Sequence, residues 1–211
     1  RDLRMSRGLG DVYKRQVYDF LYPNPASVLA FIENHDTDRF LGEGDNLPML
    51  KQASTLLLTT RRIPQLYYGT EIMMNGVKSK SDGYVRKDFP GGWTGDTETA
   101  LTAAGRSKIQ NECYNFYKTL LNWRKGNEVI AKGSMVQFMV QNGVYAYARQ
   151  HEGKTVFVML NGTDAETTVP LKFYKEILKD SKQGKDILSG KTVAFGESLT
   201  MGPRESLVIE L

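Results

Sequence analysis

The 211-residue sequence has one cysteine and no long apolar run, and each of these shortages excludes a class of protein. A single thiol, Cys113, cannot form a disulfide within the chain, which excludes a disulfide-stabilised scaffold. No stretch approaches the ~18 consecutive apolar residues of a membrane-spanning helix, and the first residues have no apolar core like that of a signal peptide. The composition, 40% hydrophobic and 25% charged, is that of a globular protein.

The chain also lacks a distributed excess of positive charge, although its formal net charge is +4. Residues 1–16 carry five Arg or Lys and two Asp, which is +3 of that +4. With no basic face elsewhere and no nucleic-acid-binding motif, the sequence argues against a nucleic-acid partner. Residues 1–16 have no helical or strand period and resemble the translation of adapter DNA that contaminates sequences assembled from environmental DNA. We therefore predict that they are a non-native or disordered leader. A genuine, disordered basic arm is the alternative.

An apolar run from Val28 to Ile32 leads directly into a polar cluster at residues 33–39. Such a run is typical of a strand buried on both faces, as in a parallel sheet. Polar residues at the carboxyl end of a strand lie where α/β folds and barrels place their chemistry. We therefore expect the functional site directly after Ile32.

A helix and a second strand follow this cluster. Asp45 or Asn46 is available as the N-cap, and Pro48 falls in the first turn, where its missing N–H costs nothing. Apolar residues at helical spacing continue to about Arg61. The next apolar run, residues 63–68, completes a strand–helix–strand unit, which is right-handed by default.

Residues 75–105 are rich in Gly, Lys and Asp and have no periodicity, which predicts a long loop over the site end of the sheet. Ser107 with Gln110 fits a capping box, which predicts a helix ending at Gly126. Cys113 falls on the apolar stripe of this helix, where a small buried hydrophobe is the usual occupant.

From Asn127 onward the hydrophobic period changes to two, which predicts strands. The turn from Gln141 to Gly143 lies between two alternating stretches and is a strong hairpin signal. Four further strands are expected, at residues 155–160, 167–171, 192–195 and 206–211. The pattern predicts an antiparallel β-sandwich over residues 127–211.

Three stretches resemble one enzyme family. Asn34-His35-Asp36 after a buried strand resembles the last conserved barrel motif of the α-amylase superfamily, glycoside hydrolase family 13. Residues 63–71 resemble the following barrel strand and its exit. Residues 86–93 resemble the neopullulanase and cyclomaltodextrinase branch of starch-degrading Gram-negative bacteria. The likeness covers roughly residues 17–211.

The resemblance implies a fold and a domain division. Residues 17–126 would be the C-terminal part of a TIM (β/α)8 barrel, namely strands seven and eight with their helices. The all-β sandwich of residues 127–211 would follow it. The chain would then be the C-terminal fragment of a longer enzyme.

The resemblance also implies a reaction, the retaining hydrolysis of α-glucosidic bonds in maltooligosaccharides, cyclodextrins or pullulan. Such enzymes need a nucleophile and a general acid, and no Asp or Glu here matches either motif, so the fragment alone should be inactive. Asp36 would be the third carboxylate, a transition-state stabiliser that holds hydroxyls of the distorted sugar. His35 would donate a hydrogen bond to the same sugar.

Three more residues are candidates for substrate binding. Asn34 is expected chiefly to orient His35 or the loop. Arg39 would pair with a catalytic carboxylate or anchor the loop, and a solvated arginine is the alternative. Trp93 would stack on the apolar face of a sugar ring, or else be the buried anchor of its own Gly-rich loop.

The remaining expectations come from the resemblance as well. The partner would be an α-glucan oligosaccharide and no cofactor would be required. Calcium is possible in the full-length enzyme, although calcium sites in the family use residues that this chain mostly lacks. The location would be the periplasm of a Gram-negative bacterium, and the residues specify no oligomeric state. The alternatives are a transglycosylase of the same family and a non-catalytic barrel relative that serves as an interaction scaffold; intact His35 and Asp36 argue against the latter.

Overall fold

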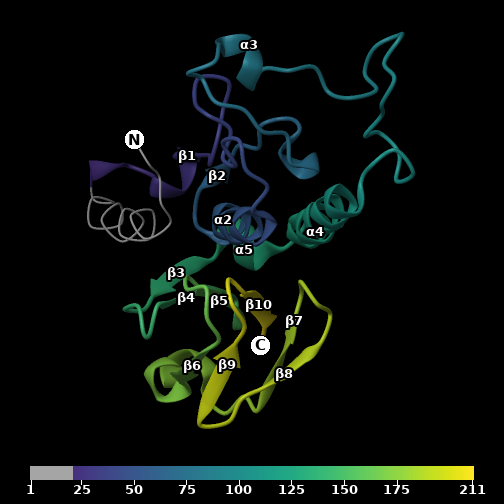
Figure 1. Cartoon of the computed structure of the whole chain (residues 1–211). Helices are drawn as coiled ribbons and strands as arrows, with labels where there is room; N and C mark the ends of the chain where they lie inside the picture. Colours follow the sequence, from purple (N-terminus) through teal and green to yellow (C-terminus); the bar gives the residue numbers. More distant parts are fainter. Residues whose placement is uncertain (1–20) are drawn as a thin grey trace.

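The computed structural model describes residues 21–211, so the predicted leader lies outside the described part of the chain. Figure 1 shows two parts that meet at a layer of helices: loops and two short strands on one side, and a set of antiparallel strands from the C-terminal residues on the other. None of the helices within residues 21–211 is long and apolar enough to cross a bilayer.

The first part contains the expected strand–helix–strand unit. Strand β1 (Leu29–Ala30) and strand β2 (Ile63–Pro64) pair in parallel, and helix α2 (Leu47–Thr59) connects them. The Asn46 side chain caps α2 by accepting a hydrogen bond from a backbone N–H of the first turn, and Pro48 lies in that turn. The helix signals read from the sequence are therefore confirmed.

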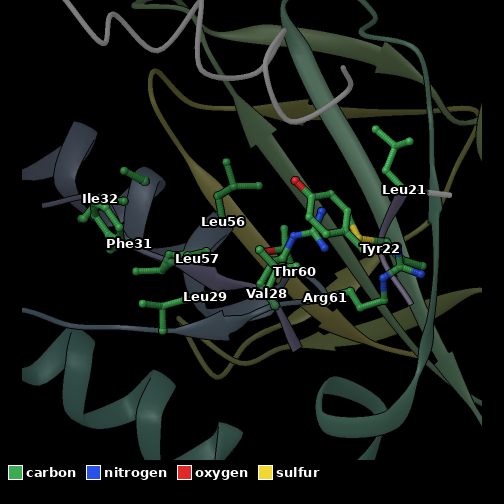
Figure 2. Close-up of a pocket in the computed structure, with 14 residues that line it drawn as sticks. Leu21, Tyr22, Val28, Leu29, Phe31, Ile32, Leu56, Leu57, Thr60 and Arg61 are labelled. Atoms are coloured by element: carbon green, nitrogen blue, oxygen red, sulfur yellow. The ribbon is translucent and has the colours of Figure 1, made fainter. Parts of the chain in front are cut away.

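The expectation that residues 28–32 are buried on both faces is wrong for this chain. Leu29 is 52% exposed, and Phe31 and Ile63 are exposed as well. The reason is that, within residues 21–211, β1 has one hydrogen-bonded neighbour, β2, so both strands are sheet edges there. Residues 28–32, which include β1, line an open, largely apolar pocket of about 610 Å³ together with Leu56 and Leu57 of α2 (Figure 2).

Short elements and a long connection lead to the next helix. A single-turn helix η2 (Pro25–Ser27) precedes β1, and η3 (Thr70–Ile72) follows β2. The loop expected over residues 75–105 contains one turn of helix, α3 (Asp82–Val85), and no other regular structure. Figure 1 shows the segment between α3 and the next helix extending away from β1 and β2.

Helix α4 (Lys108–Arg124) begins at the capping box that the sequence predicts. Ser107 Oγ accepts from the Gln110 backbone N–H, and Gln110 Oε1 accepts from the Ser107 N–H. Helix α4 packs on α2, and Cys113 is fully buried in their shared core, as expected. Burial raises the pKa of the Cys113 thiol to about 12, so the thiol stays protonated and unreactive at neutral pH.

The change to strand structure at Asn127 is later than expected. Helix α5 (Glu128–Lys132) comes first, and the Asn127 side chain caps it by accepting from the Ile130 N–H. A helix of one turn is too short to show a 3.6-residue period, so the sequence pattern gives no sign of it.

The C-terminal residues form two antiparallel sheets (Figure 1). The larger has the order β3-β4-β5-β10-β7-β8 and the smaller pairs β6 with β9. The strands are β3 (Ser134–Gln137), β4 (Val144–His151), β5 (Lys154–Asn161), β6 (Thr167–Pro170), β7 (Gln183–Asp186), β8 (Thr192–Ala194), β9 (Ser198–Met201) and β10 (Ser206–Glu210), with η4 (Leu171–Tyr174) and α6 (Lys175–Leu178) after β6. The antiparallel β-domain is therefore confirmed.

The β3–β4 turn has the geometry that its sequence favours, with φ of 51° at Asn142 and 80° at Gly143. Strands β7 and β9 and helix α6 were not predicted from the sequence. Strand β7 buries Gly184 and Asp186 rather than apolar side chains, so it lacks the alternation that identifies a strand.

A buried arginine of β4 holds the helices against the larger sheet. Arg149 is 1% exposed and donates hydrogen bonds to the carbonyl oxygens of Thr59 (2.9 Å), Ile130 (2.9 Å), Gly133 (2.8 Å) and Ser134 (3.2 Å). Burial lowers its pKa to about 10, so the guanidinium remains charged at neutral pH. One side chain thus joins the end of α2, the end of α5 and the start of β3.

Candidate functional site

The polar cluster after β1 folds into a compact turn. Asn34 Oδ1 accepts from the Asp36 backbone N–H at 2.8 Å, and Thr37 Oγ1 accepts from the Asn34 N–H at 3.1 Å. These contacts are the loop-orienting arrangement expected of Asn34. Its part in binding substrate stays a prediction.

The turn presents His35 and Asp36 to solvent as a pair. His35 Nε2 lies 3.1 Å from Asp36 Oδ2, and the two side chains are 60% and 63% exposed. A carboxylate can accept hydrogen bonds from ligand hydroxyls, and an adjacent imidazole that donates from Nε2 to this carboxylate leaves Nδ1 for the ligand. The pair therefore fits a neutral, hydroxyl-rich ligand.

Two basic residues from the loop after β2 hold the same turn. Arg86 donates from Nε to the His35 carbonyl at 3.0 Å and from Nη2 to Asp36 Oδ1 at 3.2 Å. Lys78 Nζ donates to the Asp36 carbonyl oxygen at 3.1 Å. Both basic residues also pair with Asp82, the first residue of α3. Neither basic residue was predicted from the sequence, because only the i,i+4 spacings of Lys78, Asp82 and Arg86 indicated an ordered turn there.

Both Asp36 carboxylate oxygens thus have one donor each, His35 on Oδ2 and Arg86 on Oδ1. A carboxylate offers about four acceptor positions, so roughly two remain for ligand hydroxyls. The donors fix the direction of the carboxylate without covering it. Asp36 is therefore oriented before any ligand arrives, which lowers the entropic cost of binding.

The first prediction concerns this orientation. Arg86→Ala should change the free energy of unfolding by less than about 1 kcal/mol, because the Arg86–Asp36 pair is largely exposed. It should nevertheless speed amide hydrogen exchange in residues 34–37, since the turn loses two hydrogen bonds. Thermal melts and peptide-level exchange of the 211-residue chain measure both quantities. Equal exchange in the variant and the wild type would show that Arg86 does not hold the turn.

Arg39 lies in a buried ion pair. It is 2% exposed and pairs with Glu33, also 2% exposed, with 3.3 Å between Nη1 and Oε1. The solvated-arginine alternative is therefore wrong. Arg39 anchors the loop, and its carboxylate partner is a residue that the sequence analysis did not single out.

Trp93 is 67% exposed, so the alternative that it is the buried anchor of its loop is wrong. Asp96 fixes its turn, because one carboxylate oxygen accepts from the backbone N–H groups of Gly91 (2.8 Å) and Trp93 (3.1 Å). Within residues 21–211 no hydrogen bond or ion pair joins Trp93 to His35 or Asp36. Sugar stacking by Trp93 stays a prediction.

In the described part of the chain one group of side chains is close enough together to hold a metal ion. Ligand atoms of Glu128, His151 and Glu152 lie within 4.8 Å of one another, on α5 and at the β4–β5 turn. Glu128 already pairs with Lys132 at 2.6 Å, and this group shares no residue with the Asp36 turn. Calcium in the full-length enzyme stays an expectation.

The comparisons with known proteins agree with one another. Residues 135–210 match the family described as the cyclo-malto-dextrinase C-terminal domain. An α-amylase of Niallia circulans is 31% identical over 195 residues, which is 89% of this chain and 33% of that protein. A cyclomaltodextrin glucanotransferase of Thermoanaerobacterium thermosulfurigenes is 31% identical over 188 residues, 85% of this chain and 24% of that protein. The chain thus spans a third or less of the length of these curated relatives.

Solved structures show the same likeness at the level of fold. The α-amylase of Geobacillus thermoleovorans complexed with acarbose superposes with a TM-score of 0.74 and 23% identity, over 97% of this chain and 42% of that one. A γ-cyclomaltodextrin glucanotransferase of alkalophilic Bacillus clarkii gives a TM-score of 0.72 and 25% identity, over 96% of this chain and 29% of that one. The antiparallel sheets fit the C-terminal β-domain of such enzymes. The chain therefore belongs to the α-amylase superfamily, glycoside hydrolase family 13, and carries a C-terminal domain of the cyclomaltodextrinase type.

Proposed function

We propose that the chain is the C-terminal part of an α-1,4-glucan-cleaving hydrolase of the neopullulanase or cyclomaltodextrinase type. In this proposal β1 and β2 are the last two strands of a (β/α)8 barrel, residues 17–126 are the barrel part, and residues 127–211 are the β-sandwich. The observation that carries the proposal is the exposed, pre-oriented Asp36–His35 pair directly after β1. The starch-active relatives support it, because their aligned segments span most of this chain.

The proposed role of Asp36 follows from the geometry of a sugar ring. As the ring flattens toward an oxocarbenium ion, a carboxylate that accepts from two of its hydroxyls tightens its hydrogen bonds. Interactions that strengthen in the transition state raise kcat rather than ground-state affinity. His35 would donate to a hydroxyl of the same sugar, which requires its Nε2–H to exchange the Asp36 carboxylate, now 3.1 Å away, for the ligand.

The covalent chemistry would come from residues outside this chain. Retention of configuration needs a nucleophilic carboxylate and an acid with carboxyl groups about 5 Å apart. Asp36 is paired with Arg86 and His35, and Asp82, the carboxylate that shares Arg86 Nη2 with it, is also paired with Lys78. The 211-residue chain would then supply one wall of the site.

Transglycosylation is the second candidate, and the matches to cyclomaltodextrin glucanotransferases favour it. The two reactions share the glycosyl-enzyme step and differ in whether water or a sugar hydroxyl attacks it. Product analysis of the full-length enzyme with maltotriose separates them, because transfer yields products longer than three units. The third candidate, a non-catalytic scaffold, has no need of the exposed Asp36–His35 pair.

The second prediction tests the proposal directly. The purified 211-residue chain should show no turnover of maltotriose or a cyclodextrin, whereas the full-length protein that contains it should cleave both. Reducing-sugar release measures the two rates. Turnover by the chain alone that survives Asp36→Ala would overturn the assignment of Asp36, and a full-length protein inactive on every α-glucan would overturn the proposed function.

Two further expectations belong to the full-length enzyme. Calcium, if bound, would use ligands mostly outside this chain, and chelation followed by a thermal melt of the full-length protein tests for it. A periplasmic location follows from the family branch to which residues 86–93 are similar. Cell fractionation tests that location.

A further inference from the structure

A buried ion pair brackets the turn that carries Asp36. Glu33 lies just before the turn and Arg39 just after it, and each is 2% exposed. Buried charges are costly unless they are paired and hydrogen-bonded. The sequence pattern at the end of β1 does not predict that the Glu33 carboxylate is buried. The contacts of Glu33 therefore indicate what its burial stabilises.

Every acceptor atom of Glu33 is used. Oε1 accepts from Arg39 Nη1 and from the Thr70 hydroxyl, and Oε2 accepts from the Phe40 backbone N–H. The contact with Phe40 closes residues 33–40 into a loop across its base. The contact with Thr70 ties that base to η3, beyond β2.

Arg39 connects the same base to two more segments. Its Nε donates to the Val85 carbonyl at 3.0 Å, and Nη1 donates to the Tyr68 carbonyl at 2.7 Å. Its backbone N–H donates to the Gly76 carbonyl at 2.9 Å. The guanidinium carbon also lies 4.0 Å from the centre of the Tyr67 ring, a cation–π distance.

The contacts of Arg39 also reach the segment that orients the Asp36 carboxylate. Val85, which accepts from Arg39, is the last residue of α3, and Arg86, which donates to Asp36, follows it directly. Arg39 therefore sets both the base of the turn and the position of Arg86.

We propose that Glu33 and Arg39 are positioning residues for Asp36, acting as one buried cluster with Thr70. The inference rests on the proposed function, in which Asp36 contacts the sugar. Neither charged side chain reaches solvent, so neither touches substrate. Their effect is on geometry, and a displacement of about 1 Å in a catalytic group can cost on the order of 10²-fold in rate.

Arg39→Lys is the sharpest test, because lysine keeps the charge and loses the planar fork that reaches several acceptors at once. Arg149→Lys is the matched control. Arg149 is equally buried and donates to four backbone carbonyls, but none of its partners belongs to the Asp36 turn.

Both variants should lower the melting temperature. In the full-length enzyme, assayed well below both melting temperatures, only Arg39→Lys should lower kcat on maltotriose, by about 10- to 100-fold, with KM changed by less than about threefold. In the 211-residue chain, only Arg39→Lys should speed amide exchange in residues 34–37. If Arg39→Lys acted only by destabilising the fold, the two variants would have the same kcat.

Unchanged kcat and unchanged exchange in folded Arg39→Lys would overturn the inference. If that variant does not fold, Thr70→Val replaces it, since it removes the hydroxyl that contacts both Glu33 and the Tyr67 carbonyl at constant side-chain shape. It should give a several-fold fall in kcat in the same direction, and an unchanged kcat would again overturn the inference. If the wild-type full-length protein cleaves no α-glucan, the proposed function fails, and the exchange experiment still decides the positioning of the turn.

Discussion

Asp36→Asn in the full-length enzyme is expected to lower kcat by ~10² to 10³-fold or more while substrate binding weakens much less. The substitution preserves size and shape but replaces an acceptor-only carboxylate with a neutral amide that has one acceptor oxygen. The expected loss is on the scale of removing one pre-organised electrostatic contact to a transition state. Folding stability should hardly change, because Asp36 is 63% exposed.

Measuring kcat and KM on maltotriose and on a cyclodextrin tests this expectation. His35→Ala should act in the same direction but more gently, because it removes one donor rather than a charge. Asp164→Asn is a suitable control, since Asp164 is an exposed aspartate paired with Arg204 in the β-domain. An Asp36→Asn variant with near-normal kcat would reduce Asp36 to a structural residue at the end of a strand.

Arg149→Met is expected to cause the largest loss of stability. It keeps most of the side-chain volume but removes the donor for three buried carbonyl oxygens and one part-buried carbonyl oxygen at the junction of α2, α5 and β3. Leaving buried groups unpaired in this way costs about 3–5 kcal/mol. For a chain of this length, that corresponds to a fall of roughly 10 °C in melting temperature.

Chemical denaturation of the 211-residue chain measures this change. Lys132→Met is the control, because Lys132 is exposed and its i,i+4 ion pair with Glu128 should contribute less than about 0.5 kcal/mol. A change below about 1 kcal/mol for Arg149→Met would mean that water or a shift of the helices satisfies the carbonyls, and that the junction depends on apolar packing alone.

The elements that the sequence predicted correctly are those whose signals are local. Asn46 and the Ser107–Gln110 capping box begin their helices through side chains that reach backbone groups three residues away. Asn142 and Gly143 favour their turn through their own φ preferences. The one-turn helix α5 and strand β7 were missed, since a short helix has no measurable period and β7 buries a glycine and an aspartate instead of apolar residues.

The sequence by itself determined the Asn34-to-Asp36 turn and its likeness to a carbohydrate-active family, because these residues are contiguous and the turn's own hydrogen bonds are local. Only the tertiary structure decided that Arg39 is buried against Glu33 and that Arg86 orients Asp36, since these contacts join segments up to 50 residues apart along the chain. It also decided that β1 is exposed on a pocket. Burial of a strand depends on what packs against it, and an apolar pattern records a tendency to be covered without specifying the covering element.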